Sequence, residues 1–432
     1  MGCVYSKTPN ENNPYTRNGP QTSDHNNLWR TLHDFIVQND TKSCLKLINS
    51  QRLDLNIIHT DCSSFEDESE EYISRTLKFS PLHLACLLRR AKLVEMFCKY
   101  GSDVNIRDKF GRTAINICIQ YWPRTHPGEI NAEDGVALHF RNTMKALRDC
   151  SEKSLHVLLR YGADPCEEID IFGNTLLHFC AQKGLQEPFL ILKEAGSDIE
   201  YRNTYGMTPL LFGATFGPEN MTNYMISLGC NKKSRDTFDN GLIHCLVQNQ
   251  QVSEKIIESF TDEISTDDTN ACGKTALMFA AKIGNGYKIA MLLRKGADAS
   301  LKDVNGKLAL FYFLDNNEPV HCLIGYHSLL VYTPQICVYD NLGLIALKLT
   351  RDHLRHARKI LEAESLTPTS LYRLCMYKMY CLVIQKQGSE EIIKIIILNC
   401  PNSLMTDIIT FRKFMSQYWS SIWSGIEMES IS

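Results

Sequence analysis

One phrase of the sequence decides the fold. Ser80 to Asn105 reads SPLHLACLLRRAKLVEMFCKYGSDVN, with a Ser-Pro-Leu-His start, an apolar run and a Gly-Ser-Asp-Val-Asn close. The phrase returns further along the chain, beginning at Asn174, Met207 and Lys274. The glycines that open successive phrases are Gly111, Gly173, Gly206, Gly241, Gly273, Gly306 and Gly343. Most of their steps are close to ~33 residues, which indicates a repeated structural unit.

Each part of the phrase has a physical role. The opening glycine follows a turn rich in Asp and Asn, where a positive φ excludes most other residues. The pair Thr208-Pro209 predicts a helix start, because the hydroxyl caps free amides and proline suits the first turn. A second apolar stretch then ends at a glycine C-cap, as at Gly162 and Gly196.

The repeat length and the Thr-Pro-Leu-His-x-Ala start resemble the ankyrin repeat. The resemblance covers roughly residues 28–364 and implies an all-α solenoid of helix-turn-helix units joined by β-hairpin-like turns. A single unit cannot bury its apolar face, so neighbouring units must stack. The expected function is protein–protein interaction.

The remaining segments differ in composition from the repeats. We expect a disordered N-terminal arm, a first pair of helices that caps the repeats, two insertions within them, a short helical box and a C-terminal tail. The ranges are 1–27 for the arm, 28–364 for the repeats with insertions near 57–78 and 121–150, 365–411 for the box and 412–432 for the tail. The second insertion is expected to be a loop between two helices of one repeat.

Composition excludes several functions. The net charge is −3 and the charges are intermixed, so no basic face for nucleic acid is expected. The 17 cysteines include no Cys-x-x-Cys pair, and several lie in the first apolar run of a repeat, where we expect buried, reduced thiols: Cys86, Cys118, Cys180 and Cys245. We expect no metal site and no cofactor.

Catalytic motifs are scarce. Gly273-Lys274-Thr275 resembles the end of a phosphate loop, but Asp268 stands where that motif needs glycine. His83, His178 and His244 share one slot of the phrase, where imidazole is expected to bond neighbouring turns. The chain is therefore predicted not to be an enzyme.

The N-terminus carries an acylation pattern. Met1-Gly2-Cys3-Val4-Tyr5-Ser6-Lys7 fits N-myristoylation of Gly2 and is similar to the start of Src-family kinases, which are acylated at both glycine and cysteine. One myristoyl chain binds membranes only marginally, so Cys3 would have to supply a second chain. The alternative is a chance match on an unmodified arm.

The C-terminal segment contains a second motif. Residues 367–379 read TPTSLYRLCMYKM, and helical spacing places Leu371, Leu374, Cys375 and Met379 on one face. This face resembles the first helix of the SOCS box, which implies binding to Elongin C. In that family a downstream Leu-Pro-x-Pro contacts a cullin. Here Leu398 and Pro401 are kept, but Asn399 replaces the first proline.

Repeats followed by such a box resemble the ankyrin repeat and SOCS box family of substrate adaptors for Elongin B/C–cullin ubiquitin ligases. The alternative is an acylated scaffold at a membrane with no ligase role, or a helix that merely caps the repeats. We find no secretory signal, and the apolar run from Ile392 to Leu398 is too short to span a bilayer. The expected location is cytoplasmic, with anchoring to the cytoplasmic face of a membrane if Gly2 and Cys3 are acylated.

The recognition face should lie at the turns. Two variable residues precede each turn glycine, and the pairs are Lys109-Phe110, Ile171-Phe172, Thr204-Tyr205 and Asp239-Asn240. Phe110, Phe172 and Tyr205 should form an aromatic row on the concave side that binds an unknown protein. Alternatively, each ring folds back and covers the core of its repeat.

Overall fold

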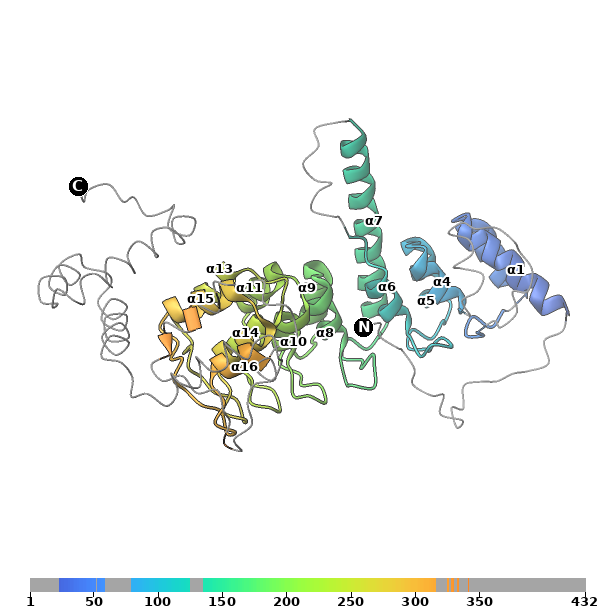
Figure 1. Cartoon of the computed structure of the whole chain (residues 1–432). Helices are drawn as coiled ribbons and strands as arrows, with labels where there is room; N and C mark the ends of the chain where they lie inside the picture. Colours follow the sequence, from blue (N-terminus) through green and yellow to red (C-terminus); the bar gives the residue numbers. More distant parts are fainter. Residues whose placement is uncertain are drawn as a thin grey trace, which may run out of the picture. The chain divides into compact units, whose positions relative to one another are not determined.

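The computed structural model describes residues 23–51, 53–58, 79–124 and 135–315, with isolated positions beyond them. Fifteen α-helices and no strand occur in these residues (Figure 1). The predicted all-α fold class is confirmed. Two isolated antiparallel bridges, Glu168–Thr175 and Thr269–Thr275, give the turns their hairpin-like character.

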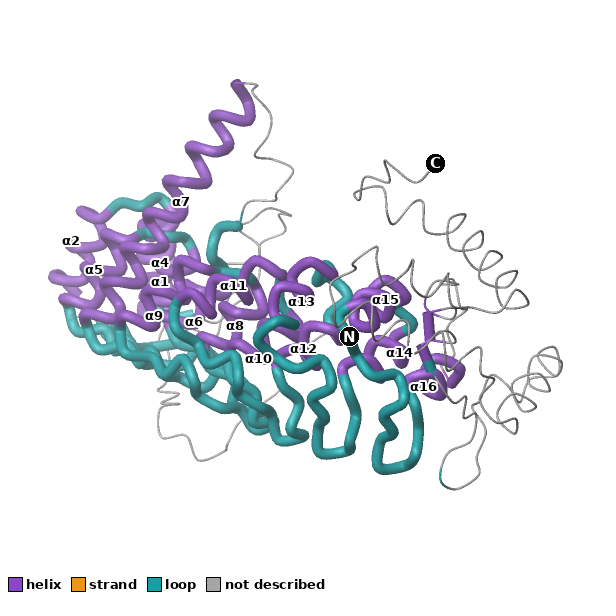
Figure 2. Tube along the Cα trace, turned by 90° about the vertical axis from the view of Figure 1, so that its left-hand side faces the viewer, coloured by secondary structure: helices purple, strands orange, loops and turns teal. Residues whose placement is uncertain are grey.

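The chain divides into two units, residues 1–245 and residues 246–432. In the first unit the first helix of each repeat packs on the first helix of the next, as α4 does on α6 and α8 does on α10. The bounds are α1 (Ser23–Val37), α2 (Thr41–Gln51), α4 (Pro81–Leu87), α5 (Ala91–Lys99), α6 (Ala114–Gln120), α7 (Gly135–Arg160), α8 (Leu176–Lys183), α9 (Gln186–Glu194), α10 (Pro209–Phe216) and α11 (Glu219–Ser227). Figure 2 shows the turns of this unit gathered along one edge of its helices.

The second unit continues the helix pairs. Its helices are α13 (Glu254–Phe260), α14 (Ala276–Ile283), α15 (Gly286–Arg294) and α16 (Ala309–Asp315), while α12 (Leu242–Gln248) lies across the boundary. Helix α14 packs on α15 and α16. Lys288 on α15 is 1% exposed, and its ammonium donates to the carbonyls of Leu246, Val247 and Asn249. Burial lowers the pKa of this lysine.

Hydroxyl residues start the first helices as the phrase predicts. The Thr208 hydroxyl accepts from the Leu211 amide at 3.4 Å, and Pro209 occupies the first turn of α10. Thr113 caps α6 in the same way through the Asn116 amide, also at 3.4 Å. Each cap satisfies an amide that the helix itself leaves unpaired.

Histidines tie successive repeats together. In α8 the amide of Thr175 donates to Nδ1 of His178 at 3.2 Å, while Nε2 lies 3.0 Å from the Met207 carbonyl of the next turn. His83 repeats this arrangement with Ser80 and with the Arg112 carbonyl at 3.2 Å. Burial lowers the pKa of both imidazoles to about 4, so they are neutral at pH 7. The predicted structural role of these histidines is confirmed.

An Asp or Asn organises each turn. The Asp170 carboxylate accepts from the amides of Phe172 and Asn174, at 2.9 and 3.0 Å. These bonds stabilise a turn in which Gly173 has the left-handed conformation (φ +67°). The same pattern of bonds to the second and fourth following amides recurs at Asp108, Asn203, Asp236, Asn270 and Asp303.

In the fourth turn of the first unit, which Asp236 anchors, the register differs from the expected one. Its left-handed residue is Asp239 (φ +61°), whereas Gly241 lies two positions later, where other repeats have their capping hydroxyl. The variable pair is therefore Thr237-Phe238 and not Asp239-Asn240. Aspartate can take this conformation because its short polar side chain bonds locally. Sequence reasoning used glycine as the marker and so read this turn wrongly.

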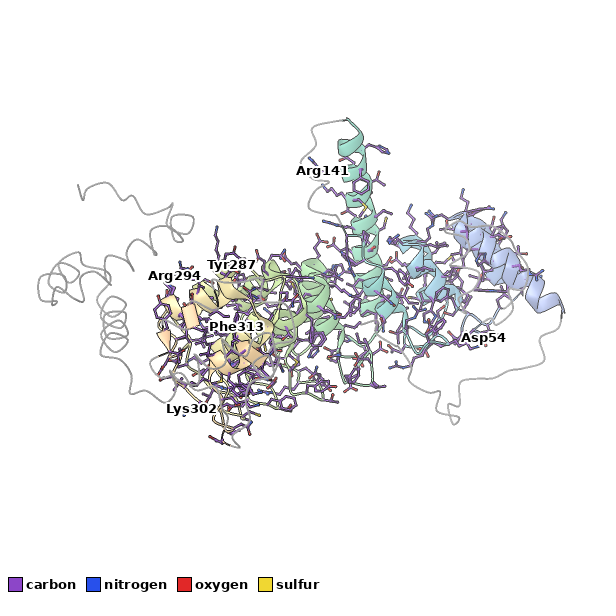
Figure 3. The ribbon with its side chains drawn as sticks, in the orientation of Figure 1. Asp54, Arg141, Tyr287, Arg294, Lys302 and Phe313 are labelled. Atoms are coloured by element: carbon purple, nitrogen blue, oxygen red, sulfur yellow. The ribbon has the colours of Figure 1, made fainter. Side chains whose placement is uncertain are left out.

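The second insertion also differs from expectation. Residues 135–153, predicted in large part as a loop, instead extend the second helix of the repeat as the first part of α7, which has 26 residues. Figures 1 and 2 show α7 projecting well beyond the neighbouring helices, and Figure 3 places Arg141 on this projecting part. The segment is rich in good helix formers such as Ala, Leu, Met, Lys and Arg, which explains the extension.

The N-terminal pair begins earlier than expected. Helix α1 starts at Ser23, within the arm predicted to be disordered up to residue 27, and Ser-Asp is a favourable helix start. Helices α1 and α2 pack on each other, and α1 packs on α4. The first insertion, near 57–78, lies almost entirely outside the described residues, as do residues 1–22.

Candidate interaction surface

Aromatic side chains stand exposed at successive turns of the first unit. Phe110, Phe172 and Tyr205 are 59%, 43% and 46% exposed. Phe238, which the sequence reasoning missed, holds the equivalent position in the fourth turn and is 56% exposed. We call these four side chains the tip aromatics. Large exposed rings repeated along one edge are typical of a protein interface.

The rings of the second and third turns touch each other. The centroids of Phe172 and Tyr205 are 5.8 Å apart, with the ring planes tilted by 32°. Phe110 instead lies under the guanidinium of Arg112, 5.0 Å from the ring centroid. These contacts cover part of each ring, as the alternative of back-folding requires. Large faces nevertheless remain open to solvent.

Arginines brace three of the four turns that carry these rings. Arg107 donates to the Gly111 carbonyl at 2.7 Å, and Arg202 donates to the Gly206 carbonyl at 3.2 Å. Arg235 does the same to the Asp239 carbonyl at 3.0 Å. A braced turn loses less conformational entropy when a partner binds.

The sequence contains a pattern that indicates the position of Phe238 within its turn. Asp236-Thr-Phe-Asp-Asn240 matches Asp170-Ile-Phe-Gly-Asn174 at the anchoring aspartate, the aromatic residue and the closing asparagine. The shared slot of His178 and His244 gives the same alignment, because each lies four residues after the closing asparagine. Both signals place Asp239 at the glycine position.

A further aromatic group lies on the first helices. Phe216 at the end of α10 is 53% exposed, and its ring centroid is 5.0 Å from that of Phe212. Phe212 in turn packs edge-on against His178 at 5.6 Å. The apolar surface of the first unit therefore also includes an exposed ring on α10.

The described residues offer little reactive chemistry. No group of His, Cys, Asp and Glu side chains in this part of the chain could hold a metal ion. Cys86, Cys118, Cys180 and Cys245 are buried and free, and burial raises the pKa of the Cys245 thiol to about 12. A thiol with a raised pKa is a poor nucleophile at neutral pH. Among the described helices, none combines the length and the apolar composition that spanning a bilayer requires.

Several predicted site residues lie outside the described residues. They are the acylation candidates Gly2 and Cys3, the Elongin C candidates Leu371, Leu374, Cys375 and Met379, and the cullin candidates Leu398 and Pro401. The box and tail segments that contain the last six residues are likewise not described.

Comparison with known proteins bears on the repeats. The family model described as "Ankyrin repeat" matches residues 78–109 and 272–304. The chain contains ankyrin repeats. They make it a module for protein–protein interaction, as the sequence predicted.

The matches to relatives cover only part of each relative's length. Human Rabankyrin-5 is 26% identical over 219 residues, which cover 47% of this chain and 18% of that protein. Human transient receptor potential cation channel subfamily A member 1 is 22% identical over 241 residues, 54% of this chain and 19% of the channel. The mouse B-cell lymphoma 3 protein homolog is 22% identical over 214 residues, 49% of this chain and 39% of the homolog. The chain thus spans less than half the length of each of these relatives.

Proposed function

We propose that this ankyrin-repeat module captures its protein partner over the tip aromatics of the first unit. The observation that carries the proposal is the exposure of an aromatic ring at four successive turns, Phe110, Phe172, Tyr205 and Phe238. Arginine side chains donate to main-chain carbonyls in three of these four turns. The proposed role is binding rather than catalysis.

The test replaces all four tip aromatics by alanine in the full chain. Partner proteins retained by the wild type on affinity purification, and identified by mass spectrometry, should be lost. The control replaces Tyr100 and Tyr161, which are 41% and 40% exposed at the ends of second helices. If the melting temperature falls sharply in the tip variant but not in the control, the rings are structural and the proposal is wrong.

We further propose that the partner is a substrate delivered to an Elongin B/C–cullin ubiquitin ligase. The support is the SOCS-like pattern of Leu371, Leu374, Cys375 and Met379, placed after the repeats as in that family. Leu371→Ala with Cys375→Ala should abolish co-purification of Elongin C, since an apolar anchor is worth about 2–4 kcal/mol at an interface. A wild-type chain that never retains Elongin C would refute the adaptor role.

The second candidate is an acylated scaffold that holds its partner at the cytoplasmic face of a membrane. The specific observation is the Gly2-Cys3 acylation pattern with Ser6. Gly2→Ala should move the chain from membrane to soluble fractions, and Cys3→Ser should do so in part, because one acyl chain remains. Recovery of the wild type wholly in the soluble fraction would exclude this role.

A further inference from the structure

Main-chain hydrogen bonds join the tips of neighbouring turns. The Phe172 carbonyl accepts from the Thr204 amide at 2.9 Å, and the Tyr205 carbonyl accepts from the Thr237 amide at 2.9 Å. The second unit has the same bond between Cys272 and Val304 at 3.1 Å. In each case the acceptor precedes the left-handed residue and the donor is the second residue of the next turn. The turns thus form a regular ladder.

The ladder is interrupted at one step in the described turns of the first unit. The turn at 108–112 and the turn at 170–174 should be joined through the Phe110 carbonyl and the Ile171 amide. Within the described residues neither group has a hydrogen-bond partner. One main-chain acceptor and one main-chain donor are therefore unpaired at the same step.

The space beside the turn glycines shows the same interruption independently. A Cβ on Gly206 would meet the Thr237 amide nitrogen at 2.9 Å, and a Cβ on Gly173 would meet Thr204 at 3.7 Å. A Cβ on Gly111 would meet nothing within 4 Å. The next turn is therefore farther from Gly111 than it is from Gly173 or Gly206, and we call this separation of the two tips the gap.

The gap is confined to the tips, because the bases of the two turns are joined. Asn105 donates to the Gly162 carbonyl at 3.0 Å, and Arg107 pairs with the buried Glu167 at 2.8 Å. The following pair of turns has a further side-chain bridge nearer the tip. There the Asn174 side-chain oxygen accepts from Asn203 at 2.8 Å.

Arg112 cannot form a bridge of this kind. It stands in the position of Asn174 and has no acceptor to offer, because a guanidinium only donates. Its guanidinium is engaged by Asp108 at 2.7 Å and lies over the Phe110 ring. The Arg112 side chain is thus held within its own turn.

The two turns offer the groups that an extended peptide uses. Apolar side chains stand exposed on both of them, namely Phe110 on one turn and Ile171 and Phe172 on the other, with Ile171 56% exposed. One turn has an unpaired main-chain acceptor and the other an unpaired main-chain donor. Peptides that add to a sheet edge use the same combination of main-chain bonds and apolar pockets.

We infer that an extended, apolar segment of the partner protein inserts between these two turns and completes the ladder. The Phe110 carbonyl accepts from an amide of the segment, the Ile171 amide donates to one of its carbonyls, and an apolar side chain lies against Phe110 and Phe172. The inference rests on the proposed function of the tip aromatics and adds the conformation of the bound segment and its place on the surface.

The interruption itself is tested on the free, full-length chain by hydrogen exchange with residue resolution. The Ile171 amide should exchange at least about ten times faster than the Thr204 and Thr237 amides, because those two are bonded within the ladder. Equal protection of all three amides would show that the ladder is closed and would overturn the inference.

Binding is tested with Ile171→Pro, which removes the donor. The turn tolerates it: the Gly173 amide bonds to the Asp170 carbonyl at 3.3 Å, and proline is favoured after the first residue of such a turn. The matched control is Ile171→Val, which keeps the amide. The probe is the set of peptides selected on the wild-type chain from a phage-displayed random library.

Selected peptides should be apolar, and Ile171→Pro should weaken them about five-fold or more, the effect of one lost hydrogen bond, while Ile171→Val binds as wild type does. If the tip-aromatic variant loses the peptides but Ile171→Pro does not, the tip proposal stands and the gap is not the site. Peptides unaffected by either variant, or no peptide selected at all, contradict both. Self-association of the wild type that Ile171→Pro abolishes would assign the gap to a second copy and overturn the partner assignment.

Discussion

Acid should weaken the repeats through their buried histidines, and His178→Asn isolates that effect. His178 is fully buried, its Nδ1 accepts from the Thr175 amide and its Nε2 lies 3.0 Å from the Met207 carbonyl. Nδ1 is therefore the unprotonated nitrogen and Nε2 carries the proton. If Nδ1 were protonated, its N–H would face the N–H of Thr175, and neither donor would have an acceptor. Protonation would also place a positive charge in an apolar site. Asn is a suitable replacement because Asn116 holds the same slot in α6.

The magnitude follows from the pKa. Burial lowers the pKa of His178 to about 4, from 6.5 in an exposed state. Between these values the unfolded chain binds a proton that the folded chain does not. Stability from neutral His178 is thus fully present above pH ~6.5, falls as pH drops, and is lost below pH ~4. The full loss is about 3 kcal/mol, of which about 2 kcal/mol is gone by pH ~5.

The assay is urea unfolding of the full chain, followed by circular dichroism, at about pH 7.5 and about pH 5. At the higher pH His178→Asn should cost about 1–3 kcal/mol, because its hydrogen bonds are lost or weakened. At the lower pH this difference should shrink by about 2 kcal/mol, since only the wild type loses stability through the titration of His178. His83, whose pKa is also lowered to about 4 by burial, should behave in the same way. A difference between wild type and variant that does not change with pH would refute the argument.

Three further outcomes are expected from single substitutions. Lys288→Met should lower the free energy of unfolding by about 3 kcal/mol or more, because three buried carbonyls lose their donor. The control Lys282→Met, on the exposed face of α14, should change it little. Equal changes of melting temperature in the two variants would contradict this prediction. Asp239→Gly should raise the free energy of unfolding, measured by urea titration, by up to about 1 kcal/mol, because glycine takes the left-handed conformation without strain. Gly206→Ala should lower it by about 1–2 kcal/mol, because φ is +67° and the Thr237 amide nitrogen would lie 2.9 Å from the new Cβ. Thr208→Ala should cost about 1 kcal/mol through loss of the α10 cap, and Thr208→Ser should restore it; an unchanged melting temperature for the alanine variant would mean that the cap contributes nothing.

Features set by local chemistry could be predicted from the sequence. The capping hydroxyl of Thr208, the left-handed Gly173 and the bridging His178 each follow from a few neighbouring residues. The position of Phe238 was missed because Asp239 performs the turn in place of glycine. Pattern reasoning treats residue identity as the signal, whereas the backbone requires only a residue that accepts the left-handed conformation.

The extension of α7 was missed for a different reason. The repeat period fixes where a second helix must lie, but it says nothing about how far an insertion continues that helix. Residues 135–153 favour helix by composition, and the base of the extension is held through Arg148 and Trp122, which both contact Glu187. Neither residue is near Glu187 in the sequence, so this brace depends on the fold.

The gap beside Gly111 depends on a relation between turns that no single phrase contains. The turn at 108–112 has the same length and the same anchoring aspartate as the turn at 170–174. The last residue of this turn, Arg112, pairs with Asp108 of the same turn, whereas Asn174 provides an acceptor for the turn that follows it. Repeats in a stack need only enough bonds between neighbours to stay together, and here Asn105, Arg107 and Glu167 supply them at the base. The tips are thereby free to differ from step to step, and a stack that is regular at its core can carry a specific binding surface at its edge.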